Sequence, residues 1–293
     1  MGMRGTARDY SNNRSLRQPT LAPGIGQPVD REAASGENRV FLDMNPKFTP
    51  EDPLRLAMWS GPRNISTALM RSWGNRDDAF VCDEPLYAHY LVKTGLPHPM
   101  AKEVIASQDT DWDKVVAWLT GPVPRGKSIF YQKHMSHHLL PEIGRDWLPQ
   151  LTNCFLIRHP AEVLPSLDEK YERPRLPDTG YPQQVEIFEH IQKRTGQASP
   201  VVDSRDILTN PRVVLGKLCA ALGVQFQEAM MSWAPGLRDT DGIWARHWYN
   251  AVEKTTGFQP YTPKNKPLPE HLRRLYEECL PYYEKLYAFR LTP

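Results

Sequence analysis

The chain has 293 residues, which is long enough for one large domain or two small ones with a sizeable core. Its 36 basic and 34 acidic residues leave a net charge of +2, and no block of like charges appears, so a nucleic-acid or membrane-surface partner has little electrostatic support. Four scattered cysteines without a CxxC pair argue against a zinc site or a disulfide framework. The sequence has no apolar stretch of about 18 residues and no signal-peptide segment, which predicts a cytoplasmic protein with a small-molecule partner and no membrane partner.

The elements expected in chain order indicate an α/β protein. Residues 1–45 are rich in Gly, Pro, Ser, Asn and Arg, so we expect a disordered or loosely ordered tail. Across residues 46–293, short apolar runs alternate with helical patterns, which predicts a three-layer, P-loop-like fold with a mainly parallel central sheet flanked by helices. The expected strands are 54–60, 79–83, 128–134, 153–158 and 201–203. The expected helices include 66–73, 111–119, 183–194, 211–222 and 270–288, and the proline-rich segment 173–182 predicts a loop or lid.

A loop with the composition of an anion site follows the first expected strand. Residues 60–67 combine turn formers, hydroxyls and an arginine just before a helical pattern, where backbone N–H groups bind phosphate or sulfate well. The candidate binding residues are Gly61, Pro62, Arg63, Asn64, Ser66 and Thr67. The loop lacks the GxxxxGK[ST] pattern, which disfavours an ordinary ATPase. The alternative is a capped turn whose arginine is solvated.

A second candidate anion site follows the fourth expected strand. Arg158 stands at the strand end and Ser166 follows eight residues later. A guanidinium can hold a phosphate bidentately, and a serine two turns along a helix can add a hydroxyl near the positive end of the helix dipole. The alternative is a surface salt-bridge arginine beside an ordinary helical serine. Two such sites together imply a ligand with two separated anionic groups.

These segments resemble the nucleotide-binding motifs of sulfotransferases that use PAPS (3′-phosphoadenosine 5′-phosphosulfate). Residues 60–67 are similar to the 5′-phosphosulfate loop of that family, and residues 155–160 with Ser166 are similar to its 3′-phosphate motif. Residues 201–224 resemble its late strand, turn and helix with a Leu-Gly-Val ending. The resemblance implies a P-loop-like fold, PAPS as co-substrate without a metal, and transfer of a sulfuryl group to a hydroxyl or amine of a small-molecule or carbohydrate acceptor.

Sulfuryl transfer needs cations around the transferred group and a base for the acceptor hydroxyl. By this analogy Arg63 is a catalytic candidate. Glu84, in an Asp-Glu-Pro-Leu run, resembles the proposed base of carbohydrate and bacterial sulfotransferases. His134 aligns with the catalytic histidine of small-molecule sulfotransferases, and Lys133, shifted by one position, should then point to the opposite strand face. The alternatives are a capping or Arg63-paired carboxylate for Glu84 and a buried core histidine for His134.

A third candidate region combines aromatic rings with cations late in the chain. We expect Trp248 to stack on an adenine and Arg246 or Lys254 to contact a 3′-phosphate, although a packed aromatic helix is the alternative.

Two other functions fit parts of these patterns. The first is a nucleotide-dependent kinase on the same type of fold, which the missing GK[ST] disfavours. The second is a catalytically degenerate nucleotide-binding or scaffold protein, which would keep both anion-site arginines but need neither candidate base.

Overall fold

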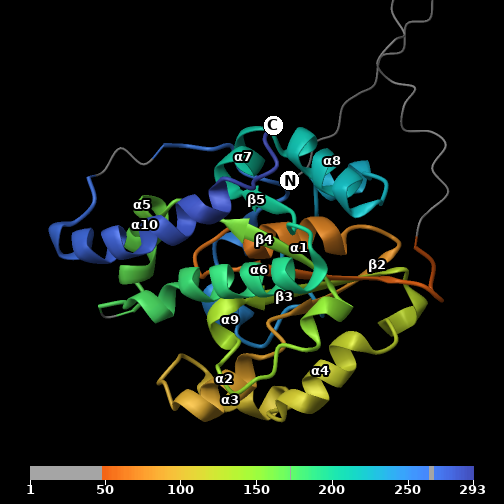
Figure 1. Cartoon of the computed structure of the whole chain (residues 1–293), viewed down its shortest axis with the longest axis horizontal. Coiled ribbons are helices and arrows are strands. Elements are labelled where there is room, and N and C mark those ends of the chain that lie inside the picture. The colour runs from red at the N-terminus through yellow and green to blue at the C-terminus, as the bar shows by residue number, and fades with distance from the viewer. Residues whose placement is uncertain (1–47, 172, 264–266) are drawn as a thin grey trace, which may run out of the picture. The chain divides into compact units, whose positions relative to one another are not determined.

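A computed structural model describes residues 48–171, 173–263 and 267–293. The tail expected at residues 1–45, and its boundary, lie outside the described residues. Five strands form a parallel sheet in the order β2-β3-β1-β4-β5 (Figure 1). They are β1 Leu54–Ser60, β2 Ala79–Asp83, β3 Ile129–Met135, β4 Thr152–Ile157 and β5 Val201–Asp203. The sequence predicted β1, β2 and β5 with these bounds and β3 and β4 within one residue, and the α/β fold class is confirmed.

Helices cover both faces of this sheet (Figure 1). They are α1 Ser66–Gly74, α2 Tyr87–Thr94, α3 Ala101–Ser107, α4 Trp112–Thr120, α5 Pro160–Asp168, α6 Tyr181–Thr195, α7 Ser204–Thr209, α8 Pro211–Leu222, α9 Ala245–Trp248 and α10 Arg273–Tyr287. Helices α1 and α8 pack on the face that carries Leu56 and Met58, whereas α4, α6 and α10 pack on the face that carries Ala57 and Trp59. Strand β1 is apolar on both faces because it lies between two helical layers.

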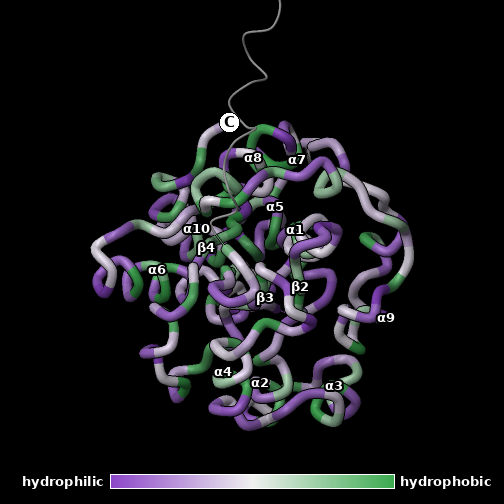
Figure 2. The backbone as a smooth tube through the Cα atoms, turned by 90° about the vertical axis from the view of Figure 1, so that its right-hand side faces the viewer, coloured by the Kyte–Doolittle hydropathy of each residue, from purple (hydrophilic) through white to green (hydrophobic). Residues whose placement is uncertain are grey.

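The long helix α6 has the pattern of a helix with one buried face. Hydrophobic and hydrophilic turns alternate along it in Figure 2, and its buried side includes Val185, Ile187, Phe188 and Ile191. None of the helices in the described part of the chain is both long and apolar enough to cross a membrane.

The structure corrects the loop predicted at 173–182. Leu176–Thr179 forms a short 3-10 helix, and α6 already begins at Tyr181. Pro182 occupies the first turn of α6, where a proline breaks no helical hydrogen bond. A proline that the sequence suggested as a breaker therefore starts a helix.

Candidate functional site

The carboxyl ends of the strands open onto a cavity of about 420 Å³. Open α/β sheets bind their ligands beyond the carboxyl ends of the parallel strands. The cavity brings together most of the site residues predicted from the sequence: Pro62, Arg63, Asn64, Ser66 and Thr67 from the first segment, Arg158 and Ser166 from the second, and Glu84. The fold therefore joins segments that are far apart in the sequence.

The loop after β1 is shaped by a close backbone approach at Gly61. A Cβ at position 61 would lie 2.4 Å from the carbonyl oxygen of Thr179, so only glycine fits there. Gly61 thus supports the loop from behind without lining the cavity. Arg63 has a φ of 55°, in the left-handed region that L-residues rarely adopt. Ile65, the residue before α1, provides no side-chain cap, so the first N–H groups of α1 remain available to a ligand.

The two anion segments contact each other directly. Arg63 Nε donates to Ser166 Oγ at 2.9 Å, and Arg158 Nη1 donates to the backbone carbonyl of Arg63 at 3.0 Å. Arg158 Nε donates to Glu162 Oε2 at 3.0 Å. Burial lowers the pKa of Arg63. The charge of Glu169 opposes this lowering, and the charge of Arg158 adds to it. The hydroxyl of Ser166 faces the loop even though Pro165 precedes it inside α5.

Three polar groups at this end of the cavity have bonding capacity to spare. Arg63 donates through neither terminal nitrogen, and Arg158 does not donate through Nη2, to any residue that the structure describes. Asn64 Nδ2 donates to the carbonyl of Leu156 at 2.9 Å, whereas the buried Asn64 Oδ1 has no hydrogen-bond partner. Buried polar groups are normally paired, so the unpaired Asn64 Oδ1 is an acceptor that a ligand donor could satisfy.

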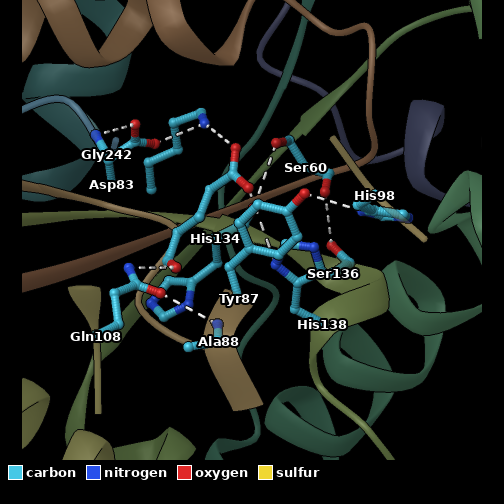
Figure 3. Close-up of polar contacts among 12 residues, drawn as sticks. Ser60, Asp83, Tyr87, Ala88, His98, Gln108, His134, Ser136, His138 and Gly242 are labelled. Carbon is cyan, nitrogen blue, oxygen red and sulfur yellow. Dashed lines mark hydrogen bonds and ion pairs between the residues drawn. The ribbon is translucent and has the colours of Figure 1, made fainter. Parts of the chain in front are cut away.

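Glu84 also lines the cavity, next to a buried lysine. Lys133 Nζ donates to Glu84 Oε1 at 2.5 Å and to Asp83 Oδ1 at 2.7 Å. It also donates to the phenol oxygen of Tyr249 at 2.9 Å. Glu84, like Arg63, has a left-handed backbone, with a φ of 44°. Figure 3 shows Asp83 and the dashed contacts that link it to its neighbours.

Burial and charge act on this cluster in opposite directions. Burial raises the pKa of Glu84 above its ordinary value of 4.5, Lys133 opposes that rise, and Asp83 adds to it. Burial alone would lower the pKa of Lys133, but Asp83 and Glu84 outweigh it and raise that pKa well above its ordinary value. Lys133 therefore stays charged, and Glu84 accepts a proton more readily than an ordinary glutamate does.

The structure places the predicted base His134 outside the cavity lining. Strand side chains alternate, and Lys133 and Met135 line the cavity while His134 faces the other helical layer. The His134 ring stacks on Trp59 with ring centroids 4.2 Å apart, and its Nε2 donates to Gln132 Oε1 at 3.3 Å. Burial, with help from the charge of Lys133, lowers the pKa of His134 to about 3. His134 is a neutral core histidine, and it cannot reach an acceptor in the cavity.

The late aromatic region contributes a wall, but not through the predicted cations. Trp248 and Tyr249 line the cavity, whereas Arg246 and Lys254 are exposed and do not. The short helix α9 turns its aromatic residues inward and its arginine outward, which composition alone could not reveal. The expected contacts of Arg246 and Lys254 with a bound nucleotide are therefore not supported by the structure.

Aromatic and histidine rings line the cavity near Glu84. Tyr87 stacks on His138 with ring centroids 4.6 Å apart and planes within 4°, and its hydroxyl is hydrogen-bonded to His98 Nδ1 at 2.9 Å (Figure 3). Trp244 contacts Tyr87 edge-on at 5.2 Å. Burial lowers the pKa of His137 to about 3 and the pKa of His138 well below its usual range. These rings are uncharged, so this end of the cavity suits a ligand part without a strong charge.

Sequence reasoning did not foresee that Lys133 contacts Asp83, Glu84 and Tyr249 in this site. The signal available for Lys133 was the strand alternation, because Lys133 and His134 necessarily face opposite sides. For Tyr249 no local signal existed, since its contact to Lys133 joins positions 116 residues apart.

Fold and site together define an α/β protein with a polar cavity at the carboxyl ends of its strands. The Sulfotransferase domain family matches residues 54–290, so the chain belongs to this sulfotransferase family. Among the described residues, no group of His, Cys, Asp or Glu side chains has the arrangement of a metal site.

Two curated relatives from Arabidopsis thaliana match most of this chain. Branched-chain-amino-acid aminotransferase-like protein 2 is 35% identical over 231 residues, which cover 78% of this chain and 40% of that protein. Branched-chain-amino-acid aminotransferase-like protein 1 is 34% identical over 240 residues, which cover 80% of this chain and 42% of that protein. The chain thus spans about two fifths of the length of these relatives.

Two solved structures share a distant likeness. The sulfotransferase domain from the curacin biosynthetic pathway has 17% identity and a TM-score of 0.48, with 77% of this chain and 97% of that chain covered. A sulfotransferase from Alicyclobacillus acidocaldarius has 14% identity and a TM-score of 0.47, with 80% and 94% covered.

Proposed function

We propose that the protein is a PAPS-dependent sulfotransferase that transfers the sulfuryl group to a hydroxyl or amine of a small-molecule or carbohydrate acceptor. The observation that supports this proposal is one cavity that is lined by Arg63, Arg158 and Glu84, with Glu84 paired to Lys133. A donor with two anionic groups and an acceptor that must lose a proton need this arrangement.

The residues present fit PAPS. The free N–H groups at the start of α1, the hydroxyls of Ser66 and Thr67, and the unused nitrogens of Arg63 would hold the 5′-phosphosulfate. Arg158 Nη2, which donates to no described residue, and the hydroxyl of Ser166 would hold the 3′-phosphate. The orphaned Asn64 Oδ1 offers an acceptor that a hydroxyl or amine of the ligand could satisfy.

When bound, PAPS supplies a sulfuryl group joined to phosphate through an oxygen that leaves with the adenosine 3′,5′-bisphosphate. Arg63 and the α1 N–H groups stabilise negative charge around the transferred group. Glu84 Oε2 accepts no hydrogen bond from a described residue and faces the cavity, so it can take the proton of the acceptor as the new S–O or S–N bond forms. Lys133 holds Glu84 Oε1 and fixes the direction in which Oε2 points.

The testing experiment is calorimetric titration of the full chain with adenosine 3′,5′-bisphosphate and, separately, with ADP and magnesium. We expect micromolar binding of the bisphosphate and little response to ADP. Preferential binding of ADP with magnesium would indicate a kinase. Binding of neither ligand would favour a catalytically degenerate scaffold protein. A positive result would justify screening hydroxyl and amine acceptors with PAPS.

A further inference from the structure

Lys133 has no hydrogen to spare for a ligand. An ammonium group carries three donors, and all three are used, by Asp83, Glu84 and Tyr249. The side chain is only 1% exposed. A lysine bound in this way acts on the reaction through its partners and does not reach out to a substrate.

The two carboxylates that share Lys133 are held very differently. Asp83 accepts three hydrogen bonds: from Lys133 at Oδ1, and at Oδ2 from the Tyr249 hydroxyl at 2.6 Å and the Gly242 N–H at 3.1 Å. Glu84 accepts one, from Lys133, and its second carboxylate oxygen faces the cavity. Asp83 is therefore fixed on both oxygens, whereas Glu84 is fixed on one.

The charges of the cluster do not balance when both carboxylates are ionised. One buried ammonium then faces two buried carboxylates, and an excess negative charge away from water is costly. A proton that enters the cluster relieves this cost, and the open oxygen of Glu84 is where it can arrive.

We infer that Asp83 is a positioning residue of the reaction. Asp83 is the fixed counter-ion of Lys133, so only one carboxylate oxygen of Glu84 is bound by the lysine, and Asp83 thereby sets how readily Glu84 takes a proton. Asp83 need not touch a substrate for this role. The inference rests on the proposed function in one respect only, that Glu84 is the base.

The other groups that face Glu84 carry no charge that could take over this role. His138 Nδ1 lies 4.0 Å from Glu84 Oε2, and burial lowers the pKa of His138 well below its usual range, so this ring is neutral. Burial raises the pKa values of Tyr87 and Tyr171, which keeps both phenols neutral. Tyr249 contacts the cluster as a neutral phenol as well, because burial raises its pKa.

The experiment follows the protonation of Glu84 directly, by infrared pH titration of its carboxylic acid band, assigned by its loss in Glu84→Gln. In Asp83→Asn, Glu84 becomes the sole counter-ion of Lys133, so we expect the titration midpoint to fall by about one pH unit or more. The acid limb of kcat/KM should move by the same amount. Tyr249→Phe is the matched control, because it removes a hydrogen bond from the same cluster without changing its charge, and its midpoint should stay within about 0.3 units.

Asp83→Asn could fail to fold with an imbalanced lysine, so a second variant carries the same test. Asp83→Asn/Lys133→Met removes the ammonium together with its fixed counter-ion, and Glu84 is left buried without a cation. Its comparison is Lys133→Met, in which Asp83 still faces Glu84. The midpoint of the double variant should lie below that of Lys133→Met, because the charge of Asp83 raises the pKa of Glu84.

The outcomes separate the inference from the proposed function. An unchanged midpoint in Asp83→Asn, equal midpoints in the double variant and Lys133→Met, or an equal shift in Tyr249→Phe overturns the role of Asp83 even if the parent transfers sulfuryl groups. The expected shifts in a protein that binds no bisphosphate would uphold the role of Asp83 in setting the proton affinity of Glu84 and refute the proposed function alone.

Discussion

Replacing Arg158 with alanine tests the two-anion cavity most directly. Arg158 uses two of its nitrogens on Glu162 and on the backbone of Arg63, and it keeps Nη2 for a ligand. Losing a charge-assisted contact to a phosphate costs about 2–4 kcal/mol of binding free energy. The dissociation constant for adenosine 3′,5′-bisphosphate should therefore rise about 30- to 700-fold.

The assay is titration calorimetry of parent and Arg158→Ala with two ligands, the bisphosphate and adenosine 5′-monophosphate. Because the second ligand lacks the 3′-phosphate, the variant should bind it about as well as the parent does, and the difference isolates the phosphate contact. Arg55→Ala is the matched control, since Arg55 also donates to a backbone carbonyl, in its case from Nε to that of Gly121 at 2.8 Å, but does not line the cavity. Equal bisphosphate affinity of parent and Arg158→Ala would refute the reasoning, and so would an equal loss in Arg55→Ala.

Three further predictions follow from the packing and charge of the site. Gly61→Ala should lower the free energy of unfolding by about 1–3 kcal/mol in urea titrations, because its Cβ would meet the Thr179 carbonyl, whereas Gly216→Ala, with nothing within 4 Å, should not destabilise. Glu84→Gln should keep its affinity for the bisphosphate and lose about 10²–10⁴-fold in turnover, whereas His134→Asn should keep its turnover. The opposite pattern in assays with PAPS would indicate that His134 is the base. His134 has a folded pKa of about 3, below its unfolded value, so the unfolded state binds the extra proton and stability falls as the pH drops below about 6.5. By pH 5 this one residue should cost about 2 kcal/mol, a loss that disappears from the pH dependence of chemical unfolding in His134→Gln.

Local sequence patterns predicted the sheet well because each strand lies in an apolar environment on both faces. β1 and β2 stand between turn formers and carry almost no polar side chains, so their limits could be read directly. The loop at Gly61 and the pair Arg158 and Ser166 were recognisable for the same reason, since turn chemistry and short spacings are local properties.

Other parts of the site depend on choices that short patterns do not record. Which strand face meets the cavity decides whether Lys133 or His134 lines it, and the structure turns Lys133 towards the cavity. Whether a late cation points inward depends on how α9 packs, and this excluded Arg246 and Lys254 from the cavity. The pairing of Lys133 with Tyr249 joins distant segments and could come only from the tertiary structure.

The left-handed backbone of Arg63 and Glu84 has a consequence for laboratory evolution. Each of these residues occupies a conformation, with φ of 55° and 44°, in which an L-residue costs roughly 1 kcal/mol or more and glycine costs little. A library of variants screened for heat resistance alone would therefore drift towards glycine at position 63, whereas glycine at position 84 would also remove the carboxylate that Lys133 contacts. The selected proteins would be more stable but would lack the arginine of the proposed anion site.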